Sequence, residues 1–464
     1  MMIIVGALRD LGFFTWIVQK IVSVPNLTGA KFVFLTTVSS ALLACAVDEV
    51  TSIIFISTLI FQVCDRLKLS PKLYILVAVL ATNIGSSGTM MGNPVGIYIG
   101  NKGGLTFGDF MIWAFPIMLT CLFATVAFLC LIFRKEFKKF DAALENRLAQ
   151  GLSLAPTIDV PYKAGLILLL FTVCIIACHH PLESFFGLGK NSVLIVTPLI
   201  VSGIVMIIKS YRARYYVERE VDWWTLIFFL LLFAVAGTLE YTHVDQIMAK
   251  SFSKICGTST LTLVPFIFGI SAVGSAFVDN VVFVAAFCPV IEQLAISVKD
   301  FPLWWALLFG ACYGGNITMI GSTANIVALG MLEKRSAGNI TFFEWLKVGL
   351  LCTILSGAIV VGALLVLSNF MADRPSDVRL TYLHKDSGRD FSGKLVNLQG
   401  DIVQKDGETR LMMLEKTADG KNITASIKVN GKVNARDDAD ELVTGILSKD
   451  EANAGYPWQI TVKE

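Results

Sequence analysis

Two polar runs that interrupt apolar sequence decide the fold of this chain. The first is Thr82-Asn83-Ile84-Gly85-Ser86-Ser87-Gly88-Thr89-Met90-Met91-Gly92-Asn93-Pro94, and the second is Gly314-Gly315-Asn316-Ile317-Thr318-Met319-Ile320-Gly321-Ser322-Thr323-Ala324-Asn325. Gly, Ser, Thr and Asn at this density break a helix. An open break presents unpaired carbonyl and amide groups, which can replace the water shell of a small ion. Glycines that only let helices pack closely explain Gly85 or Gly96 taken singly, but not whole polar runs. We interpret both runs as discontinuous helices at an ion-binding site.

The composition around these runs is that of an integral membrane protein with a polar tail. The chain has 464 residues, of which 55% are hydrophobic and 16% charged. The chain has 38 basic and 36 acidic residues, and about 30 of these charged residues lie in the last 93 positions. The preceding part therefore has too few charges to cover the surface of a soluble domain. This excludes a soluble enzyme for most of the chain. A net charge of +2 without a basic stripe argues against nucleic acid as a partner.

Long apolar stretches predict the membrane-spanning helices, since a span needs about 20 apolar residues. Stretches 32–64 and 261–295 are interrupted by acidic residues near their middle, so we predict re-entrant helical hairpins there, with two short helices around a polar tip as the alternative. Other helices must surround such hairpins, because polar backbone is not tolerated in contact with lipid. The remaining predicted spans are 73–100, 110–133, 162–179, 192–208, 222–240, 302–332 and 343–369.

Basic clusters predict the orientation of the chain, because they favour the cytoplasmic side. Residues 134–139 and 209–214 are the strongest clusters, and two spans lie between them. Residues 65–68 and 333–335 also come out cytoplasmic when the spans are counted along the chain. Helix 343–369 then leads outward. We therefore expect a multi-pass protein of the cell (inner) membrane with an extracytoplasmic tail.

The two halves of the apolar part resemble each other. Ser40-Ala41 … Val47-Asp48-Glu49-Val50 recurs as Ser271-Ala272 … Val278-Asp279-Asn280-Val281, at an offset of 231. Two further blocks recur in the same order: 88–92 as 317–321, and 105–110 as 340–345. The orientation places the first hairpin on the cytoplasmic side and the second outside, which predicts inverted repeats. Inverted repeats with interrupted helices are typical of secondary transporters whose site lies near the membrane midplane.

Three carboxylic acids lie in the middle of the predicted hairpins. Asp48, Glu49 and Asp279 have no Lys or Arg within ten residues. Intramembrane acids are costly and usually functional, and burial favours their protonated form. Such a group can bind a proton in one state and a cation in another. The alternative is a hydrated hairpin tip where Asp48 only caps a helix, and one residue can fill both roles.

The acids favour a cation as the transported species, with an anion as the alternative. The amino ends of half-helices attract anions, and the hydroxyls of Thr51, Ser52 and Thr89 are able to bind a carboxylate together with a coupling cation. However, the hairpins and broken helices contain no basic residue. Two adjacent acids repel an anion unless they are protonated or cation-bound. Exchange of Na+ or Li+ for protons is the better-supported interpretation.

These motifs resemble the ion-transporter superfamily. This superfamily includes arsenite efflux permeases, D-type sodium/proton antiporters, citrate-transporter-like permeases, divalent anion/sodium symporters and the melanosomal P protein. The resemblance is carried by 275–281, 314–325 and 82–94, and it extends over roughly residues 1–370. It implies two inward-pointing hairpins and two discontinuous helices that move by an elevator-like shift. It also implies coupling to sodium or protons, with citrate, another dicarboxylate or an oxyanion such as arsenite as the alternative substrate.

The chain departs from the family pattern at three points. Members often carry Asn after the hairpin Asp, where the first hairpin here has Glu49. Gly96 stands where the second half has Asn325, which removes one side-chain ligand. The amino terminus also looks two to three helices short of the second half.

The predicted architecture is an all-α polytopic membrane protein with a small β-rich carboxyl-terminal domain. We expect a first inverted repeat at 1–140, a cytoplasmic linker at 141–161, a second repeat at 162–370 and an extracytoplasmic domain at 371–464. Turn signals such as Asp406-Gly407 separate the strands expected in that domain. Those strands are 378–384, 393–398, 409–415, 422–429 and 458–463.

The predicted functional site has no catalytic residue, because no nucleophile–base pair accompanies the acids. No cofactor is expected beyond Na+ or H+ as the coupling ion. The expected partners are membrane lipid, a small inorganic ion or small carboxylate, and a second copy of the chain in a homodimer. Na+ is expected at Asp48, Asn83, Asp279 and Asn316. The whole predicted ion or substrate site comprises Asp48, Glu49, Thr51, Ser52, Asn83, Gly85, Ser87, Thr89, Asn93, Ser275, Asp279, Asn280, Asn316, Thr318, Ser322 and Asn325.

Overall fold

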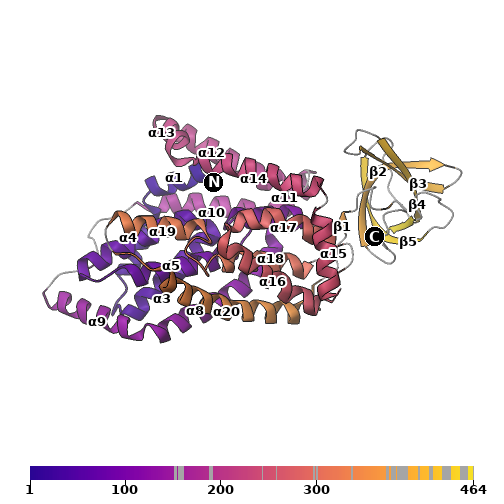
Figure 1. Ribbon diagram of the computed structural model, residues 1–464. Coiled ribbons are helices and arrows are strands. Elements are labelled where there is room, and N and C mark those ends of the chain that lie inside the picture. Colours follow the sequence, from indigo (N-terminus) through magenta and orange to yellow (C-terminus); the bar gives the residue numbers. More distant parts are fainter. Residues whose placement is uncertain are drawn as a thin grey trace. The chain divides into compact units, whose positions relative to one another are not determined.

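The structure is a computed structural model, in which helices occupy most of the chain before a carboxyl-terminal set of strands (Figure 1). Two compact units are formed: 1–236 with 264–288 and 304–366, and 237–263 with 289–303 and 367–464. The expected class, all-α with a small β-rich domain, is confirmed. The described residues are 1–150, 154, 161–187, 192–242, 244–257, 259–295, 298, 301–335, 338–371, 376–377, 383, 395–405, 408–416, 422–430, 440–449 and 458–462.

Each predicted hairpin is a pair of helices separated by two residues. In the first half, α3 (Gly29–Ala46) is followed by α4 (Glu49–Leu67), and in the second, α16 (Thr260–Phe277) is followed by α17 (Asn280–Ala295). The breaks are Val47-Asp48 and Val278-Asp279, so an aspartate directly precedes the returning helix both times. An aspartate at this position satisfies free backbone N–H groups at the start of a helix, which explains why the chain breaks there.

Both polar runs form the predicted helix breaks. α5 (Lys72–Gly85) and α6 (Pro94–Lys102) flank the first run, and α18 (Phe301–Gly314) and α19 (Thr323–Lys334) flank the second. Asn93 accepts a hydrogen bond from the backbone N–H of Gly96 and so begins α6, where proline follows as the first residue. Ser322 begins α19 in the same way by accepting from Ala324 N.

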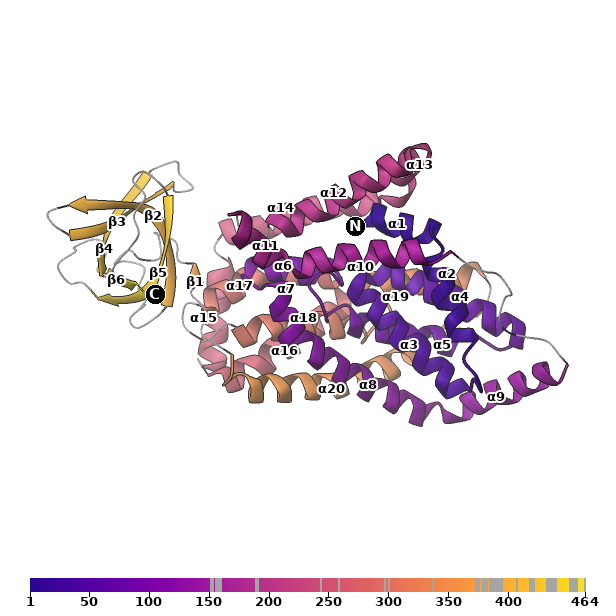
Figure 2. The same ribbon diagram turned by 180° about the vertical axis from the view of Figure 1, so that it is seen from behind.

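In the first unit, α8 packs against α5, and α12 packs against α10 and α1 (Figures 1 and 2). α1 and α2 are bent by 59° where Gly12 takes a left-handed conformation. The linker predicted at 141–161 begins within the helix α9. The bounds are α1 Met2–Asp10, α2 Phe13–Val22, α7 Phe107–Asp109, η1 Phe110–Ala114, α8 Phe115–Ile132, α9 Arg134–Ala149, α10 Lys163–Ala177, α11 His179–Phe186, α12 Ser192–Ile208, α13 Ser210–Tyr215, η2 Tyr216–Glu220, α14 Trp223–Tyr241, α15 Val244–Cys256 and α20 Phe342–Leu367.

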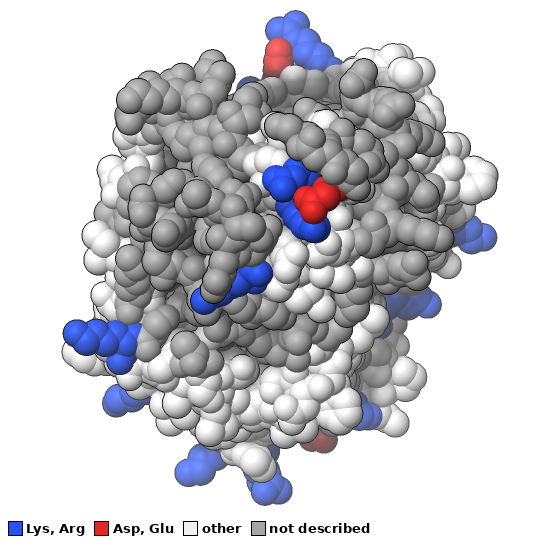
Figure 3. Space-filling view, turned by 90° about the vertical axis from the view of Figure 1, so that its right-hand side faces the viewer, with Lys and Arg blue, Asp and Glu red and all other residues white. Residues whose placement is uncertain are grey.

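Several helices are able to cross a membrane. Within the described residues, five are long and apolar enough, or six if the bent pair α1–α2 counts as one span. Shorter apolar helices include the pieces α5, α17 and α18 of the interrupted elements. Leu131, Leu199 and Ile207 are each more than two-thirds exposed, as expected of helix faces in lipid. On the face drawn in Figure 3, lysine and arginine side chains are scattered among uncharged residues.

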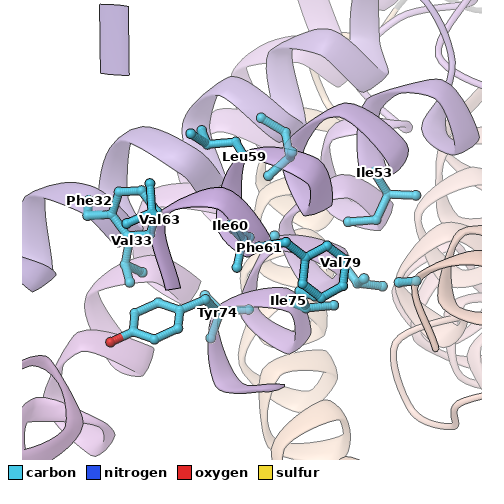
Figure 4. Close-up of a cluster of buried hydrophobic side chains, with 14 of the residues drawn as sticks. Phe32, Val33, Ile53, Leu59, Ile60, Phe61, Val63, Tyr74, Ile75 and Val79 are labelled. Carbon is cyan, nitrogen blue, oxygen red and sulfur yellow. The ribbon is translucent and has the colours of Figure 1, made fainter. Parts of the chain in front are cut away.

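The centre of the first half is a close-packed contact between α3, α4 and α5. Figure 4 shows Phe32 and Val33 of α3, Phe61 of α4 and Tyr74 of α5 in one buried cluster. The rings of Phe32 and Tyr74 meet edge to face, with centroids 5.9 Å apart. In lipid, apolar side chains gain little by leaving their surroundings, so such packing holds helices together chiefly by van der Waals contact.

The carboxyl-terminal strands close into a barrel. They form a sheet in the order β1-β2-β3-β4-β6-β5, and β2 also pairs with β5. One half of β2 pairs with β5 and the other half with β3, and the change occurs beside Gly400, where a Cβ would lie 2.5 Å from the Met412 carbonyl oxygen. β4 and β6 are parallel. The short strand β1 also pairs in parallel with β2, so the described sheet contains two parallel pairs. The bounds are β1 Ser376–Asp377, β2 Leu395–Lys405, β3 Glu408–Lys416, β4 Asn422–Asn430, β5 Asp440–Lys449 and β6 Trp458–Val462.

The strand predictions are largely confirmed. Three of them coincide with β3, β4 and β6, and the prediction 393–398 covers only the first part of β2. The antiparallel register pairs Lys405 with Glu408 across the predicted Asp406-Gly407 turn. The strand predicted at 378–384 lies, except for Leu383, outside the described residues. β5 was not predicted.

Candidate functional site

The two hairpin aspartates begin the helices that follow them. Asp48 accepts hydrogen bonds from Thr51 N (2.7 Å) and Thr51 Oγ1 (2.6 Å). Asp279 accepts from Val281 N (3.0 Å) and, through its other oxygen, from Thr323 Oγ1 (2.9 Å). The capping role considered for Asp48 is therefore present in both halves. The bond to Thr323 also ties the second hairpin to the first residue of α19.

The residues next to these aspartates are buried and have polar atoms without a hydrogen-bond partner. Glu49 and Asn280 are only 4% and 1% exposed. Within the described part of the chain, Glu49 Oε2 and both polar atoms of the Asn280 amide have no hydrogen-bond partner. A buried polar group without a partner costs about 1–3 kcal/mol, and more if it is charged. A ligand that these groups bind would remove that cost.

The surroundings of Glu49 are polar and acidic. Its carboxyl group lies against the side chains of Asn93 and Ser86 and interacts electrostatically with Asp279 and Asp48. None of these neighbours is basic. Hard cations prefer oxygen ligands of this kind. The carboxyl group of Glu49, with its hydroxyl and amide neighbours and two acids within electrostatic reach, therefore favours a cation or a proton.

A network of buried amides joins the two broken helices. Asn83 Nδ2 donates to Asn316 Oδ1 (2.8 Å) and to Asn325 Oδ1 (2.9 Å), and Ser322 Oγ donates to Asn83 Oδ1 (3.0 Å). Asn325 Nδ2 donates in turn to the carbonyl oxygens of Gly315 (2.7 Å) and Thr318 (2.9 Å). The orphan carbonyls of the second break are thereby satisfied by a side chain. Asn83 of the first half thus lies at the centre of the polar network of the second half.

At the first break, the contact with the second half is made by smaller groups. Asn93 Nδ2 donates to Ser86 Oγ (3.0 Å) and to Cys312 Sγ (3.3 Å). Ser87 Oγ donates to Ile84 O (2.7 Å) and lies 3.4 Å from the Tyr313 hydroxyl. The Cys312 thiol of the second half therefore contacts the first break. At the equivalent place, the Asn83 amide of the first half contacts the second break.

Several contacts recur at equivalent positions of the two halves. The Thr89 hydroxyl donates to the Cys45 carbonyl, and the Thr318 hydroxyl donates to the Ala276 carbonyl. A Cβ on Gly85 would lie 2.4 Å from Ala41 backbone atoms, and a Cβ on Gly314 would lie 2.4 Å from the Ala272 carbonyl oxygen. The repeated contacts support the predicted sequence repeat, while its inverted orientation stays a prediction.

The predicted site residues fall into three groups. Asn83, Asn316, Ser322 and Asn325 meet directly, and Asn93 lies beside Glu49. Ser52 is turned elsewhere: its hydroxyl donates to Ser40 O at 2.7 Å. Three predicted residues hold the breaks against the neighbouring hairpin helices, namely Thr89, Thr318 and Ser275, whose hydroxyl donates to Ala311 O.

The sequence interpretation missed several polar partners of the site. Ser86 lies inside the first polar run, and Thr323 inside the second, so both were visible as candidates. Cys312 has a signal as well, because it stands at the offset of 229 from Asn83. Among the residues that the structure describes, no three His, Cys, Asp or Glu side chains gather as a metal site.

Comparison with known proteins identifies the family. A family model described as "Citrate transporter" matches residues 1–310 and 192–428. The chain belongs to this citrate transporter family. Within the family's wider relatives, an uncharacterized transporter of Mycobacterium tuberculosis is 30% identical over 368 residues, covering 77% of this chain and 82% of that protein. The "46 kDa membrane protein" of Mycobacterium leprae is 32% identical over 370 residues, with the same coverage.

Two further similarities agree with this citrate transporter family. The P protein of Mus musculus is 24% identical over 456 residues, which cover 78% of this chain but 53% of that protein. The crystal structure of the Alcanivorax borkumensis YdaH transporter has a TM-score of 0.52 and 19% identity, and covers 80% of this chain and 84% of that one. The fold is therefore shared with a solved transporter. The chain is a membrane transporter of the ion-transporter type, as its motifs predicted.

Proposed function

We propose that this protein is a secondary active transporter that exchanges Na+ or Li+ for protons. The observation that carries the proposal is the buried carboxyl of Glu49, which has an unpartnered oxygen and two other acids, Asp48 and Asp279, within electrostatic reach. A cation or a proton relieves the charge of this group, and the two compete for it. Competition for one carboxyl group is the simplest physical basis for antiport.

A second candidate is coupled uptake of citrate, another dicarboxylate or an oxyanion such as arsenite. The description of the matching family, citrate transporter, favours it. The acids around Glu49 oppose a free anion. An anion therefore has to enter together with a cation or with protonated carboxyl groups, and the amino ends of α6 and α19 would then attract it.

We also propose where the protein is located, how it assembles and how it moves. We expect it in the cell (inner) membrane, in contact with lipid, as a homodimer whose barrel domain is extracytoplasmic. Alternating access would follow an elevator-like shift of the hairpins and broken helices. The contacts that repeat at Gly85 and Gly314 support such a movement, because they tie each hairpin to its broken helix as one body.

Transport assays in vesicles test the proposal. Purified full-length protein is reconstituted with an internal acid load, and a pH dye reports proton movement after pulses of NaCl, LiCl or choline chloride. We expect Na+ or Li+ to dissipate the gradient, choline to have no effect, and Asp279→Asn to abolish the response. Asp65→Asn is the matched control, since Asp65 is exposed and paired with Arg335 away from these acids.

The same vesicles separate the two candidates. Absence of a response to both cations would contradict antiport. Proton movement that then follows citrate, succinate or arsenite instead would support the second candidate. Vesicles that respond to none of these solutes would refute both.

A further inference from the structure

We propose that a cavity between the starts of α5 and α9 binds the phosphate group of an anionic phospholipid of the surrounding membrane. This cavity shares no lining residue with the polar site of the hairpins and broken helices, and its role does not depend on which solute is transported. The proposal rests on the depth of the cavity in the membrane, on the charge around it and on the polar and apolar side chains that line it.

The cavity lies where the chain passes from the first hairpin to the first broken helix. It has a volume of about 230 Å³, and its polar lining consists of Ser70, Lys72, Tyr74, Glu136 and Lys139. The first three belong to the connection between α4 and α5 and to the first turn of α5, and the last two belong to the first turns of α9. Pockets that enclose whole small molecules usually measure about 300–1,000 Å³, so this cavity suits a single headgroup.

Two membrane-spanning helices end at the cavity. α4 and the continuous helical segment Phe107–Ile132 are both long and apolar enough to cross a membrane. Leu69, two residues beyond α4, and Phe133, one residue beyond α8, both line the cavity. The cavity therefore lies at the depth where the hydrocarbon ends and the phosphate groups begin. Leu131, two residues before Phe133, is 76% exposed, as expected of a side chain beside acyl chains.

The chain around the cavity carries an excess of positive charge. Residues 65–72 and 134–139, which flank it, contain seven basic and two acidic side chains. Both segments lie at the end of a span, and the sequence predicts the same side of the membrane for their basic clusters. Basic clusters next to a span are typical of proteins that bind anionic lipid.

Lys72 and Lys139 supply the positive charge inside the cavity. Lys139 Nζ donates to Glu136 Oε1 (2.7 Å), which compensates the acid of the lining. Lys72 acts electrostatically on Glu344, but the Glu344 carboxyl group already accepts a hydrogen bond from Thr341 N (2.8 Å). The lining thus has one more positive charge than negative charges, and a phosphate diester carries the single negative charge that balances it. Hydrogen bonds from ammonium groups to phosphate oxygens are among the strong ones, because both partners are charged.

Tyr74 adds a rigid hydroxyl donor to the two lysines. Figure 4 shows its ring at the edge of the labelled side chains, and the ring centroid lies 5.9 Å from those of both Phe32 and Phe140. Tyr74 is 5% exposed, and its phenol interacts electrostatically with Glu136, which places the hydroxyl on the side of the cavity. A phenol donates its proton to an oxyanion, and a donor that packing already holds in place loses little entropy on binding.

The apolar part of the lining favours a lipid over a free anion. Leu69, Leu73 and Phe133 form this part. A free phosphate ion would leave these side chains facing water, whereas the glycerol and upper acyl carbons of a lipid would cover them. A choline headgroup carries its own cation, which Lys72 and Lys139 would repel. The lining therefore selects an anionic phospholipid such as phosphatidylglycerol.

Competition binding on the purified full-length protein tests the proposal. Phosphatidylglycerol with a fluorophore in one acyl chain is added to delipidated protein in nonionic detergent, and fluorescence anisotropy reports its binding. Unlabelled phosphatidylglycerol should displace it. Phosphatidylcholine should need a concentration at least about tenfold higher, which is the factor that one hydrogen bond to a charged group contributes. Inorganic phosphate at the concentrations used for the unlabelled lipid should not displace it.

Two double variants of equal charge separate binding in this cavity from general attraction. Lys72→Gln with Lys139→Gln removes both ammonium groups of the lining, and should weaken binding at least about tenfold. Lys135→Gln with Lys138→Gln removes the same charge from exposed positions of α9 outside the lining, and should bind like the wild type. Glu136→Gln removes the acid that competes for Lys139, and should bind at least as tightly as the wild type.

Size exclusion and thermal melting without added lipid show whether the variants are folded. An equal loss in the two double variants would overturn the proposal, because charge alone would then explain the binding. Weaker binding by folded Glu136→Gln would contradict the charge balance on which the proposal rests. Phosphatidylcholine that displaces the probe as well as phosphatidylglycerol does would show that the cavity does not select negative charge. Inorganic phosphate that displaces the probe as well as the lipid does would assign the cavity to a free anion, and the lipid proposal would fail.

Discussion

Replacing Asn83 by alanine should destabilise the protein more than any other single truncation in the broken helices. The change removes both N–H groups that donate to Asn316 and Asn325, and the oxygen that accepts from Ser322. All four residues are 1% exposed or less. Three buried polar atoms are left without this partner, at about 1–3 kcal/mol each. Because Ser322 Oγ still accepts from Ala324 N, and the Nδ2 groups of Asn316 and Asn325 keep their acceptors in place, we expect the lower part of that range, a loss of about 3–5 kcal/mol.

The chain offers two matched controls for this prediction. Cys312→Ala truncates the equivalent position of the second half, where Asn93 makes one 3.3 Å contact with sulfur, so its loss should be about 1 kcal/mol. Thr125→Val replaces a buried hydroxyl that has no partner within the described residues, so it should be neutral or stabilising. The free energy of unfolding is compared in detergent micelles by chemical denaturation, with thermal melting as a second measurement.

The order of the three variants is the decisive result. Asn83→Ala should be clearly the least stable, Cys312→Ala intermediate and Thr125→Val equal to the wild type. A Cys312→Ala variant as unstable as Asn83→Ala would refute the reasoning, because it would mean that side-chain volume, and not the amide network, holds the two broken helices together.

Two further predictions concern a close helix contact and the pH dependence of the barrel. Gly85→Ala should prevent folding, because its Cβ would lie 2.4 Å from backbone atoms of Ala41, whereas Gly203→Ala has nothing within 4 Å and should elute from size exclusion like the wild type. The hydrogen bond from Lys428 lowers the pKa of Glu408 below its usual value. The pair therefore stabilises β3–β4 fully at any pH above the usual pKa of a glutamate, and this stabilisation is lost as the pH falls through the lowered pKa. The protection of β3–β4 peptides against hydrogen exchange in the full chain, taken relative to the intrinsic exchange rate at each pH, should therefore fall at acid pH in the wild type, and much less so in Lys428→Met.

The sequence predicts the interrupted elements well, because their signals are local. An acid within an apolar stretch, or a run of Gly, Ser and Asn, costs too much in a continuous membrane helix to have another explanation. The misses have physical reasons too. The helix α9 was not predicted, because it is highly charged, although Phe137, Phe140 and Leu144 are buried at helical spacing. β5 contains Gly445, which weakens a strand signal but is required where Thr461 O would lie 2.4 Å from a Cβ.

The partners within the site could not be predicted, because the repeat relates residues that do not touch. The offset pairs Asn83 with Cys312, whereas in the structure each of them meets residues of the opposite half, Ser322 and Asn93 respectively. A repeat gives equivalent positions, and only the way in which the halves face each other turns those positions into contacts. The sequence identifies the equivalent positions, but it does not show how the two halves face each other.

The repeat also separates what the fold requires from what function requires. Both halves have glycine at the equivalent positions Gly85 and Gly314, because a side chain at either position would clash with the hairpin backbone. Glu49 and Asn280 share the same position after a capping aspartate and the same burial, but differ in chemistry. Neither side chain is held by a complete set of hydrogen bonds, so packing does not explain the choice of residue. Under the antiport proposed above, this difference is expected, because a buried carboxyl group can bind a cation or a proton whereas an amide does not titrate.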